Sequence, residues 1–291
     1  MKHFLILSIL FMTVANLYLV LKIRGRKTPV NHSTAIRPYS VIPPITVEPE
    51  APKQVIPEFI QVPKYHTSED SVLGDIISHS RQPPFGNSSG RSTNAHETSH
   101  GVHSEIRNEY ARKLGKKVNA FYCLDGRAVV IEEPDMKKRQ VVGFVPQSLR
   151  SYRFGTYLTG ANEWDDEPLY LCDEWQAYLN GGSCGVFDVQ HGRYRDGKTD
   201  GVSGCLEFSI YATALAMAIE KHDHDYWEKN KQFHDYIHFT LQESYRIYMI
   251  GSKMEQFSWD KQDALLERLR TSPDAAEMRE FLKKHFDGVW L

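Results

Sequence analysis

The fold is decided by residues 92–114, which read STNAHETSHGVHSEIRNEYARKL. No proline interrupts this stretch, and Ile106, Tyr110 and Leu114 recur at helical spacing, which predicts one long helix. Its first three residues are all types that favour the N-cap position, so we expect the helix to begin among them. Gly101 weakens the helix by about 1 kcal/mol relative to alanine, and a glycine there could allow another element to approach closely.

Residues 96–100 of this helix form the pattern H-E-x-x-H. Residues four apart lie on one face of a helix, so His96 and His100 can direct their imidazoles at one metal ion. Glu97 is rotated by about 100° from His96 and would lie beside a water on the metal. Zinc held by three protein ligands keeps its fourth position for such a water and lowers its pKa to about 7. The pattern therefore predicts zinc-assisted hydrolysis with Glu97 as general base.

We expect the third ligand on a second, downstream helix. The longer pattern H-E-x-x-H-x-x-G-x-x-H is excluded, because His103 and Ile106 stand where it needs a glycine and a histidine. Residues 168–182, PLYLCDEWQAYLNGG, begin with a proline suited to a first helical turn and end with glycines suited to a stop. Glu174 lies in the apolar stripe of this helix, where a carboxylate is costly unless paired or coordinated. Asp173 should point elsewhere, and we expect it to serve as a control that leaves the metal unaffected.

These two segments together resemble the gluzincin metallopeptidases, which combine H-E-x-x-H with a glutamate on a later helix. Matched residue by residue, the resemblance implies that His96, His100 and Glu174 bind zinc and that Glu97 is the base. It also implies a zincin-like fold that cleaves a peptide or another amide. In many gluzincins an acidic residue four positions after the glutamate orients a ligand histidine. Tyr178 occupies that position here, which departs from the pattern, and it is kept as a candidate for contacting a ligand histidine or a developing oxyanion.

Two other groups compete for these roles. His234 and His238 form a second i, i+4 pair with Asp235 in place of the glutamate, although their stripe of aromatic neighbours favours packed histidines. Glu207, in a nearly all-apolar segment, could replace Glu174 as the ligand, orient a ligand histidine or form a structural hydrogen bond. A polar surface helix with two solvated histidines is the alternative that involves no metal.

We expect the hydrogen-bond donors that stabilise a developing oxyanion in the glycine-rich segment 183–204. It contains His191 and Tyr194, which are candidates because amide hydrolysis needs a donor beside the metal. An ordinary polar surface loop is the alternative for this segment.

The N-terminal residues 1–27 predict a single-pass membrane anchor. Phe4–Leu21 is an uninterrupted apolar run long enough to span a bilayer, and it continues past any small-residue cleavage site, as a signal anchor does. The basic residues 22–27 favour a cytoplasmic location for the large domain. The proline-rich linker 28–67 instead suits a spacer in an extracytoplasmic space, and we expect the domain on that side.

The folded domain is expected over residues 68–291. Val118–Leu124 and Arg127–Ile131 flank Asp125-Gly126, a strong hairpin signal, and Val141–Val145 is a candidate third strand. Further helices are expected over 203–221, 225–250, 260–270 and 274–286. The predicted fold class is α+β, predominantly helical with a small antiparallel sheet.

Charge and cysteine content indicate which binding partners and cross-links to expect. A formal net charge of −2 and a pI of about 6.7 give no reason to expect nucleic-acid binding. The four cysteines are sparse, so a disulfide such as Cys184–Cys205 is compatible with the sequence without being required.

Two classes of function remain. The first is a membrane-anchored zinc-dependent hydrolase, a metallopeptidase that cleaves an amide bond with Glu97 as general base. The second is a membrane-tethered binding or scaffold protein whose metal site is structural or vestigial. Structural zinc is usually closed by four protein ligands, so His103 as a fourth ligand would favour the second class.

Overall fold

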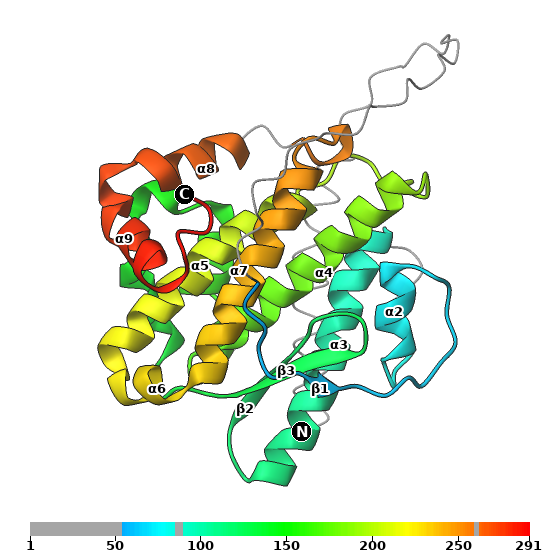
Figure 1. Cartoon of the computed structure of the whole chain (residues 1–291), viewed down its shortest axis with the longest axis horizontal. Helices are drawn as coiled ribbons and strands as arrows, with labels where there is room; N and C mark the ends of the chain where they lie inside the picture. Colours follow the sequence, from blue (N-terminus) through cyan, green and yellow to red (C-terminus); the bar gives the residue numbers. More distant parts are fainter. Residues whose placement is uncertain (1–53, 85–89, 259–261) are drawn as a thin grey trace. The chain divides into compact units, whose positions relative to one another are not determined.

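Residues 54–84, 90–258 and 262–291 are described by a computed structural model (Figure 1). The predicted membrane anchor and residues 28–53 of the predicted linker lie outside the described residues. The helices are α2 (Val72–Ser78), α3 (Arg91–Leu114), α4 (Tyr170–Gln190), α5 (Gly201–His222), α6 (His224–Lys229), α7 (Lys231–Gly251), α8 (Gln262–Thr271) and α9 (Ala276–His285). The strands are β1 (Ile60–Gln61), β2 (Val118–Tyr122) and β3 (Arg127–Glu132).

Short helical turns lie in several of the remaining connections. They are η1 (Lys138–Phe144), η2 (Gln147–Leu149), η3 (Phe154–Thr159, a π-helical turn), η4 (Asn162–Trp164), η5 (Glu255–Phe257) and η6 (Pro273–Ala275). The described part of the chain is mostly helical with one small antiparallel sheet, so the α+β prediction is confirmed at that level.

The sheet is built on the predicted hairpin. β2 and β3 pair antiparallel with Val118 opposite Glu132, and β1 joins the other edge of β3. The predicted third strand at Val141–Val145 is wrong, because residues 138–144 form η1 and the third strand comes from residues 60–61. A short apolar run does not distinguish a strand from a buried helical turn, and Val141 is buried in the turn.

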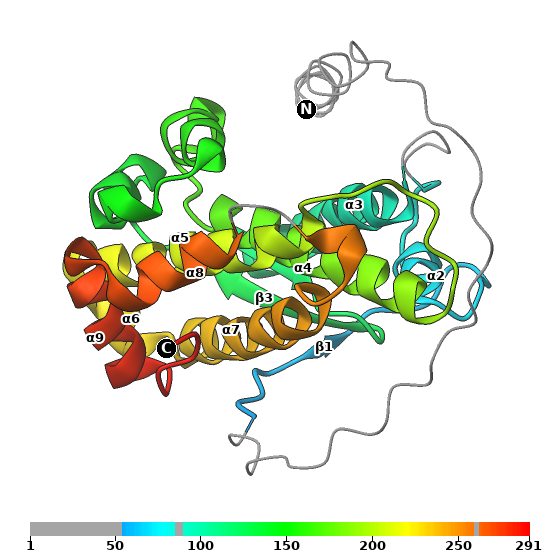
Figure 2. The same cartoon turned by 90° about the horizontal axis from the view of Figure 1, so that it is seen from above.

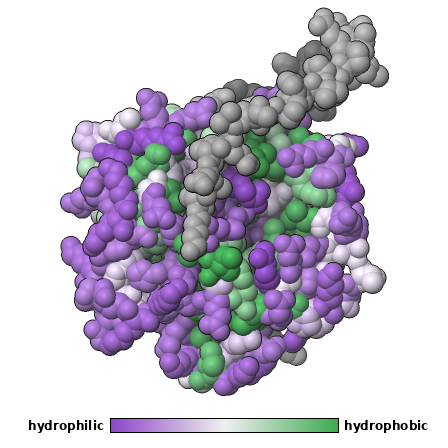
Figure 3. All heavy atoms as spheres, in the orientation of Figure 1, coloured by the Kyte–Doolittle hydropathy of each residue, from purple (hydrophilic) through white to green (hydrophobic). Residues whose placement is uncertain are grey.

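The most apolar helix forms the centre of the fold. α5 contacts α4 and α7 (Figure 2). Nearly all of its side chains from Val202 to Ile219 are buried. Among the described residues, α5 is the one helix long and apolar enough to cross a membrane, and 94% of its apolar window is buried inside the fold. That burial is typical of a core helix. The surface in Figure 3 is mainly hydrophilic, with hydrophobic patches between the polar side chains.

Close packing of α3 against α4 builds the site. The predicted helix stop at Gly181-Gly182 is wrong, because α4 continues to Gln190. A Cβ atom added to Gly181 would lie 2.9 Å from the Ser92 carbonyl oxygen and 3.3 Å from His96 Cβ. The glycine therefore lets the two backbones approach, and tertiary packing overrides its tendency to end a helix.

The start of α3 also differs from the prediction. α3 begins at Arg91 with Gly90 as its N-cap and no side-chain cap, so the expected cap among residues 92–94 is wrong. At Gly101, in contrast, a Cβ atom added to the glycine would have no other atom within 4 Å. No other element therefore approaches Gly101 closely.

Residues before Ser68 take part in the fold. The backbone N–H of Val55 donates to Gln242 Oε1 at 3.2 Å, and that of Glu58 donates to Gln232 Oε1 at 2.9 Å. Both acceptors lie on α7, so the folded part extends N-terminally of Ser68.

Two further details concern the helices and cysteines. The predicted helix 225–250 is divided into α6 and α7 at Asn230, whose side chain accepts from the N–H of Phe233 and caps α7. All four cysteines are buried with free thiols, and the Cys184–Cys205 disulfide is not formed.

Candidate metal centre

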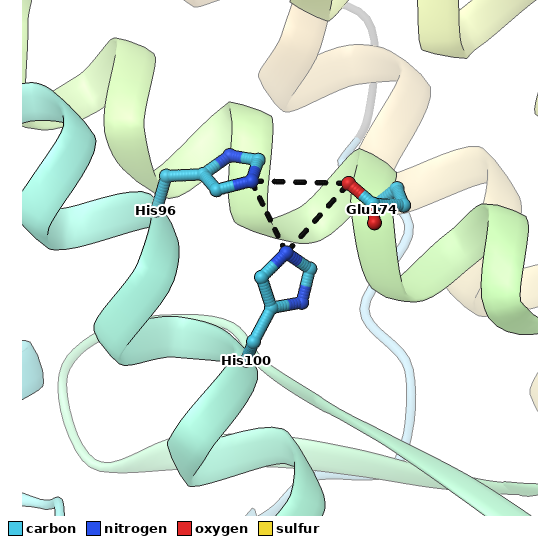
Figure 4. A group of neighbouring side chains, drawn as sticks. All are labelled: His96, His100 and Glu174. Atoms are coloured by element: carbon cyan, nitrogen blue, oxygen red, sulfur yellow. Dashed lines mark hydrogen bonds and ion pairs between the residues drawn. The ribbon is translucent and has the colours of Figure 1, made fainter. Parts of the chain in front are cut away.

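Three side chains from two helices converge at one point. His96 and His100 come from α3, and Glu174 comes from the second turn of α4 (Figure 4). The two Nε2 atoms lie 3.1 Å apart, and Glu174 Oε2 lies 3.8 Å from that of His96 and 3.6 Å from that of His100. Ligands of a tetrahedral zinc at normal bond lengths are about 3.3–3.6 Å from one another. The spacing therefore fits a single small metal ion.

The donor chemistry fits the same ion. Glu174 is fully buried, and neither of its carboxylate oxygens has a hydrogen-bond partner among the described residues. A buried carboxylate without a partner is costly, and a bound cation would remove that cost. Two imidazoles and one carboxylate are a usual ligand set for zinc with one open position.

The surroundings of His96 and His100 shift the pKa values of the two imidazoles in opposite directions. Burial lowers the pKa of His96 well below its usual value, and the neighbouring His100 adds to this. Burial acts in the same direction on His100, but the charges of Asp173 and Glu174 outweigh it and hold the pKa of His100 well above its usual value. The site thus attracts positive charge, which a metal ion can supply in place of a proton.

Asp173 does not point away from the centre, so its prediction as a neutral control is wrong. Asp173 Oδ2 lies 2.8 Å from His100 Nδ1, and its Oδ1 lies 2.5 Å from His103 Nδ1. The physical reason is the packing of α4 against successive turns of α3, which places two consecutive α4 residues on that helix. The charges of both histidines outweigh burial and hold the pKa of Asp173 well below its usual range.

His103 is fully buried and is not a fourth ligand of the converging group. Its Nδ1 is bonded to Asp173, and its Nε2 has no hydrogen-bond partner among the described residues. The ligand atoms of His96, His100 and Glu174 form one group without it. His103 stands three residues after His100 on the same helical face, which is the sequence feature that could have indicated its place.

Glu97 is not one of the converging residues, but its carboxyl interacts electrostatically with His100 and Glu174. Burial raises the pKa of its carboxyl, with Glu174 adding to the rise and His100 opposing it. A raised pKa suits a carboxylate that must accept and return a proton near neutral pH.

Tyr178 lies beside the centre, in a network that the sequence did not predict. Its ring packs edge-on against His96 with centroids 4.5 Å apart. Its hydroxyl accepts from Arg153 Nε at 3.2 Å and lies 3.3 Å from the hydroxyl of Tyr157 in η3. Tyr178 therefore contacts His96 through its ring, while its hydroxyl is shared with Arg153 and Tyr157.

Glu207 belongs to an ion pair. Its Oε2 accepts from Arg153 Nη1 at 2.8 Å, and its Oε1 accepts from Tyr211 at 2.6 Å and from Ser151. With both oxygens occupied, it is neither a metal ligand nor a partner of a ligand histidine. Its suggested roles at the metal are therefore wrong, and the structural alternative is correct.

His191 and Tyr194 lie beyond the opposite end of α4 from Glu174. His191 caps the C-terminus, and 17 residues of helix at 1.5 Å each place it about 25 Å along the axis from Glu174. Its ring stacks on Phe187, and the Tyr194 hydroxyl donates to the Gly197 carbonyl. The structure does not bring either residue to the centre.

The rival histidine pair does not converge. His234 Nε2 lies 2.8 Å from the Trp227 carbonyl oxygen, and its ring packs against the Trp227 ring. His238 Nε2 lies 3.5 Å from Asp287 Oδ2, while Asp235 pairs with Lys231. Within the described ranges, neither histidine belongs to a group of converging ligand atoms.

Comparison with protein-family models, with curated proteins and with solved structures gives no match for this chain. The assignment of a function therefore rests on the geometry of the site.

Proposed function

We propose that this chain is a zinc-dependent hydrolase, a metallopeptidase that cleaves an amide bond and is tethered to a membrane through residues 4–21. The observation that carries the proposal is the convergence of three ligand atoms, from His96, His100 and Glu174, with no fourth protein ligand in the group. A structural zinc is usually closed by four protein ligands, whereas a catalytic zinc keeps one position open. His103, the candidate for closure, is occupied by Asp173 instead.

The chemistry follows from the residues around that open position. Zinc, when bound, acts as a Lewis acid that polarises a carbonyl and lowers the pKa of a coordinated water. Glu97 accepts a proton from the attacking water as the new C–O bond forms at the carbonyl carbon. As the C–N bond breaks, Glu97 returns that proton to the leaving amine. We infer a peptide or other amide as substrate, and an extracytoplasmic location for the domain, from the sequence alone.

Glu97→Gln tests the proposal. The full-length chain is purified in detergent, loaded with zinc and incubated with a mixed peptide library, with new termini detected by mass spectrometry. We expect the variant to keep its zinc and to lose on the order of 10²–10⁴-fold in cleavage rate. Glu109→Gln, a control on the same helix, removes an exposed ion pair with Arg81 and should leave cleavage unchanged. A zinc-loaded wild type without cleavage would favour the binding or scaffold alternative.

A further inference from the structure

We propose that His103 is a positioning residue for the metal centre, and that it fixes the tautomer and orientation of the His100 imidazole through Asp173. The inference rests on the proposed function only in taking His100 as a metal ligand. It concerns a histidine outside the converging group, on the turn of α3 that follows His100.

Both oxygens of Asp173 are engaged, one by each histidine. The Nδ1 atoms of His100 and His103 lie 2.8 Å and 2.5 Å from them. An ionised carboxylate only accepts hydrogen bonds, so each imidazole carries its proton on Nδ1. For His100 this leaves Nε2 as the nitrogen that faces His96 and Glu174, and a metal ion would bind there in place of the proton on that nitrogen.

The same distances argue against a second metal ion at His100, His103 and Asp173. Ligand atoms around one tetrahedral ion are about 3.3–3.6 Å apart. Contacts of 2.5 and 2.8 Å are too short for that arrangement and fit charge-assisted hydrogen bonds. Asp173 is therefore a hydrogen-bonding bridge between the two histidines.

His103 has no other polar contact among the described residues. It is fully buried, its ring packs against Phe121 with centroids 6.2 Å apart, and its Nε2 has no partner. An apolar side chain would fill this place without leaving a buried nitrogen unpaired. What the imidazole adds is the second hydrogen bond to Asp173, which prevents the carboxylate from rotating away from His100.

The test measures the zinc dissociation constant of the full-length chain by competition with a chromophoric chelator. Asp173→Asn should weaken binding by roughly 10–100-fold, the usual effect of losing a partner of a ligand histidine. His103→Leu should weaken it about tenfold through the same route. His103→Asn should restore most of the affinity, because its amide N–H can replace the Nδ1–H donor. His234→Leu, a histidine change on another helix, should leave the affinity unchanged.

The double variant separates positioning from general packing. If His103 acts through Asp173, adding His103→Leu to Asp173→Asn should cost no further affinity, whereas independent effects would add. Wild-type affinity in His103→Leu, or additive losses, would overturn the proposal. Circular dichroism of the zinc-free variants identifies any that fail to fold.

Nitrogen-15 NMR of the unmutated chain decides the matter without a variant. In the zinc-loaded chain both His100 and His103 should carry the proton on Nδ1, and an Nε2–H tautomer on either would overturn the proposal. Zinc binding without hydrolysis would defeat the proposed function and leave this inference standing. A wild type that binds no zinc would defeat both.

Discussion

The Nε2 atoms of His96 and His100 face each other at 3.1 Å, with a buried Glu174 oxygen within 4 Å of both. Two neutral imidazoles meeting in this way place two lone pairs together unless a cation lies between them. Glu174 adds a fully buried negative charge beside them. The three atoms therefore form a site that is stable only with positive charge, from a proton or from a metal ion.

Glu174→Gln should reduce zinc affinity by more than the roughly 10–100-fold that losing an outer partner costs, because it removes one of three ligands. Glu207→Gln is the matched control, another buried glutamate on a neighbouring helix. It should keep zinc affinity but lower the free energy of unfolding by up to about 3–5 kcal/mol, because Arg153 loses a buried partner. Isothermal titration with zinc and urea unfolding measure the two effects. Normal zinc binding in Glu174→Gln would remove this residue from the site.

Replacing Gly101 of α3 and Gly181 of α4 with alanine should change the free energy of unfolding in opposite directions. Gly101→Ala should raise the free energy of unfolding by up to about 1 kcal/mol, because open space surrounds the new methyl group. Gly181→Ala should cost about 1–3 kcal/mol and weaken zinc binding, because its methyl group meets Ser92 and His96. Thermal unfolding and zinc titration of both variants check this. Equal effects would show that α3 and α4 do not pack as described.

Glu133 should make stability depend on pH away from the metal centre. Burial raises the pKa of its carboxyl from 4.5 to about 8, with the Glu167 charge adding to the rise. In the unfolded chain the carboxyl ionises near 4.5, so its stabilising contribution is complete below that pH and is lost as the pH rises to about 8. Glu133→Gln is uncharged throughout, so its stability relative to wild type should increase across this window. Urea unfolding at several pH values measures the difference, and a constant difference would contradict the raised pKa.

The sequence predicts the parts of the site that depend on one helix at a time. His96 and His100 share a face because helical spacing alone requires it. Glu174 was found because a carboxylate in an apolar stripe needs a partner. The three side chains converge in the structure, and metal binding by them stays a prediction.

The remaining features depend on how helices pack, which spacing within one helix does not reveal. Asp173 reaches His100 and His103 because α4 lies against two successive turns of α3. Gly181 is needed inside a helix because the neighbouring backbone, at Ser92, leaves no room for a side chain. Glu207 is paired by Arg153, which is 54 residues away in the chain.

The most direct test of the account is metal analysis of the purified full-length chain by inductively coupled plasma mass spectrometry. We predict one zinc per chain for the wild type and for Glu97→Gln, and none for His96→Ala or His100→Ala. Unchanged zinc in both histidine variants, with loss in a His234→Ala, His238→Ala double variant, would contradict the assignment of the metal centre.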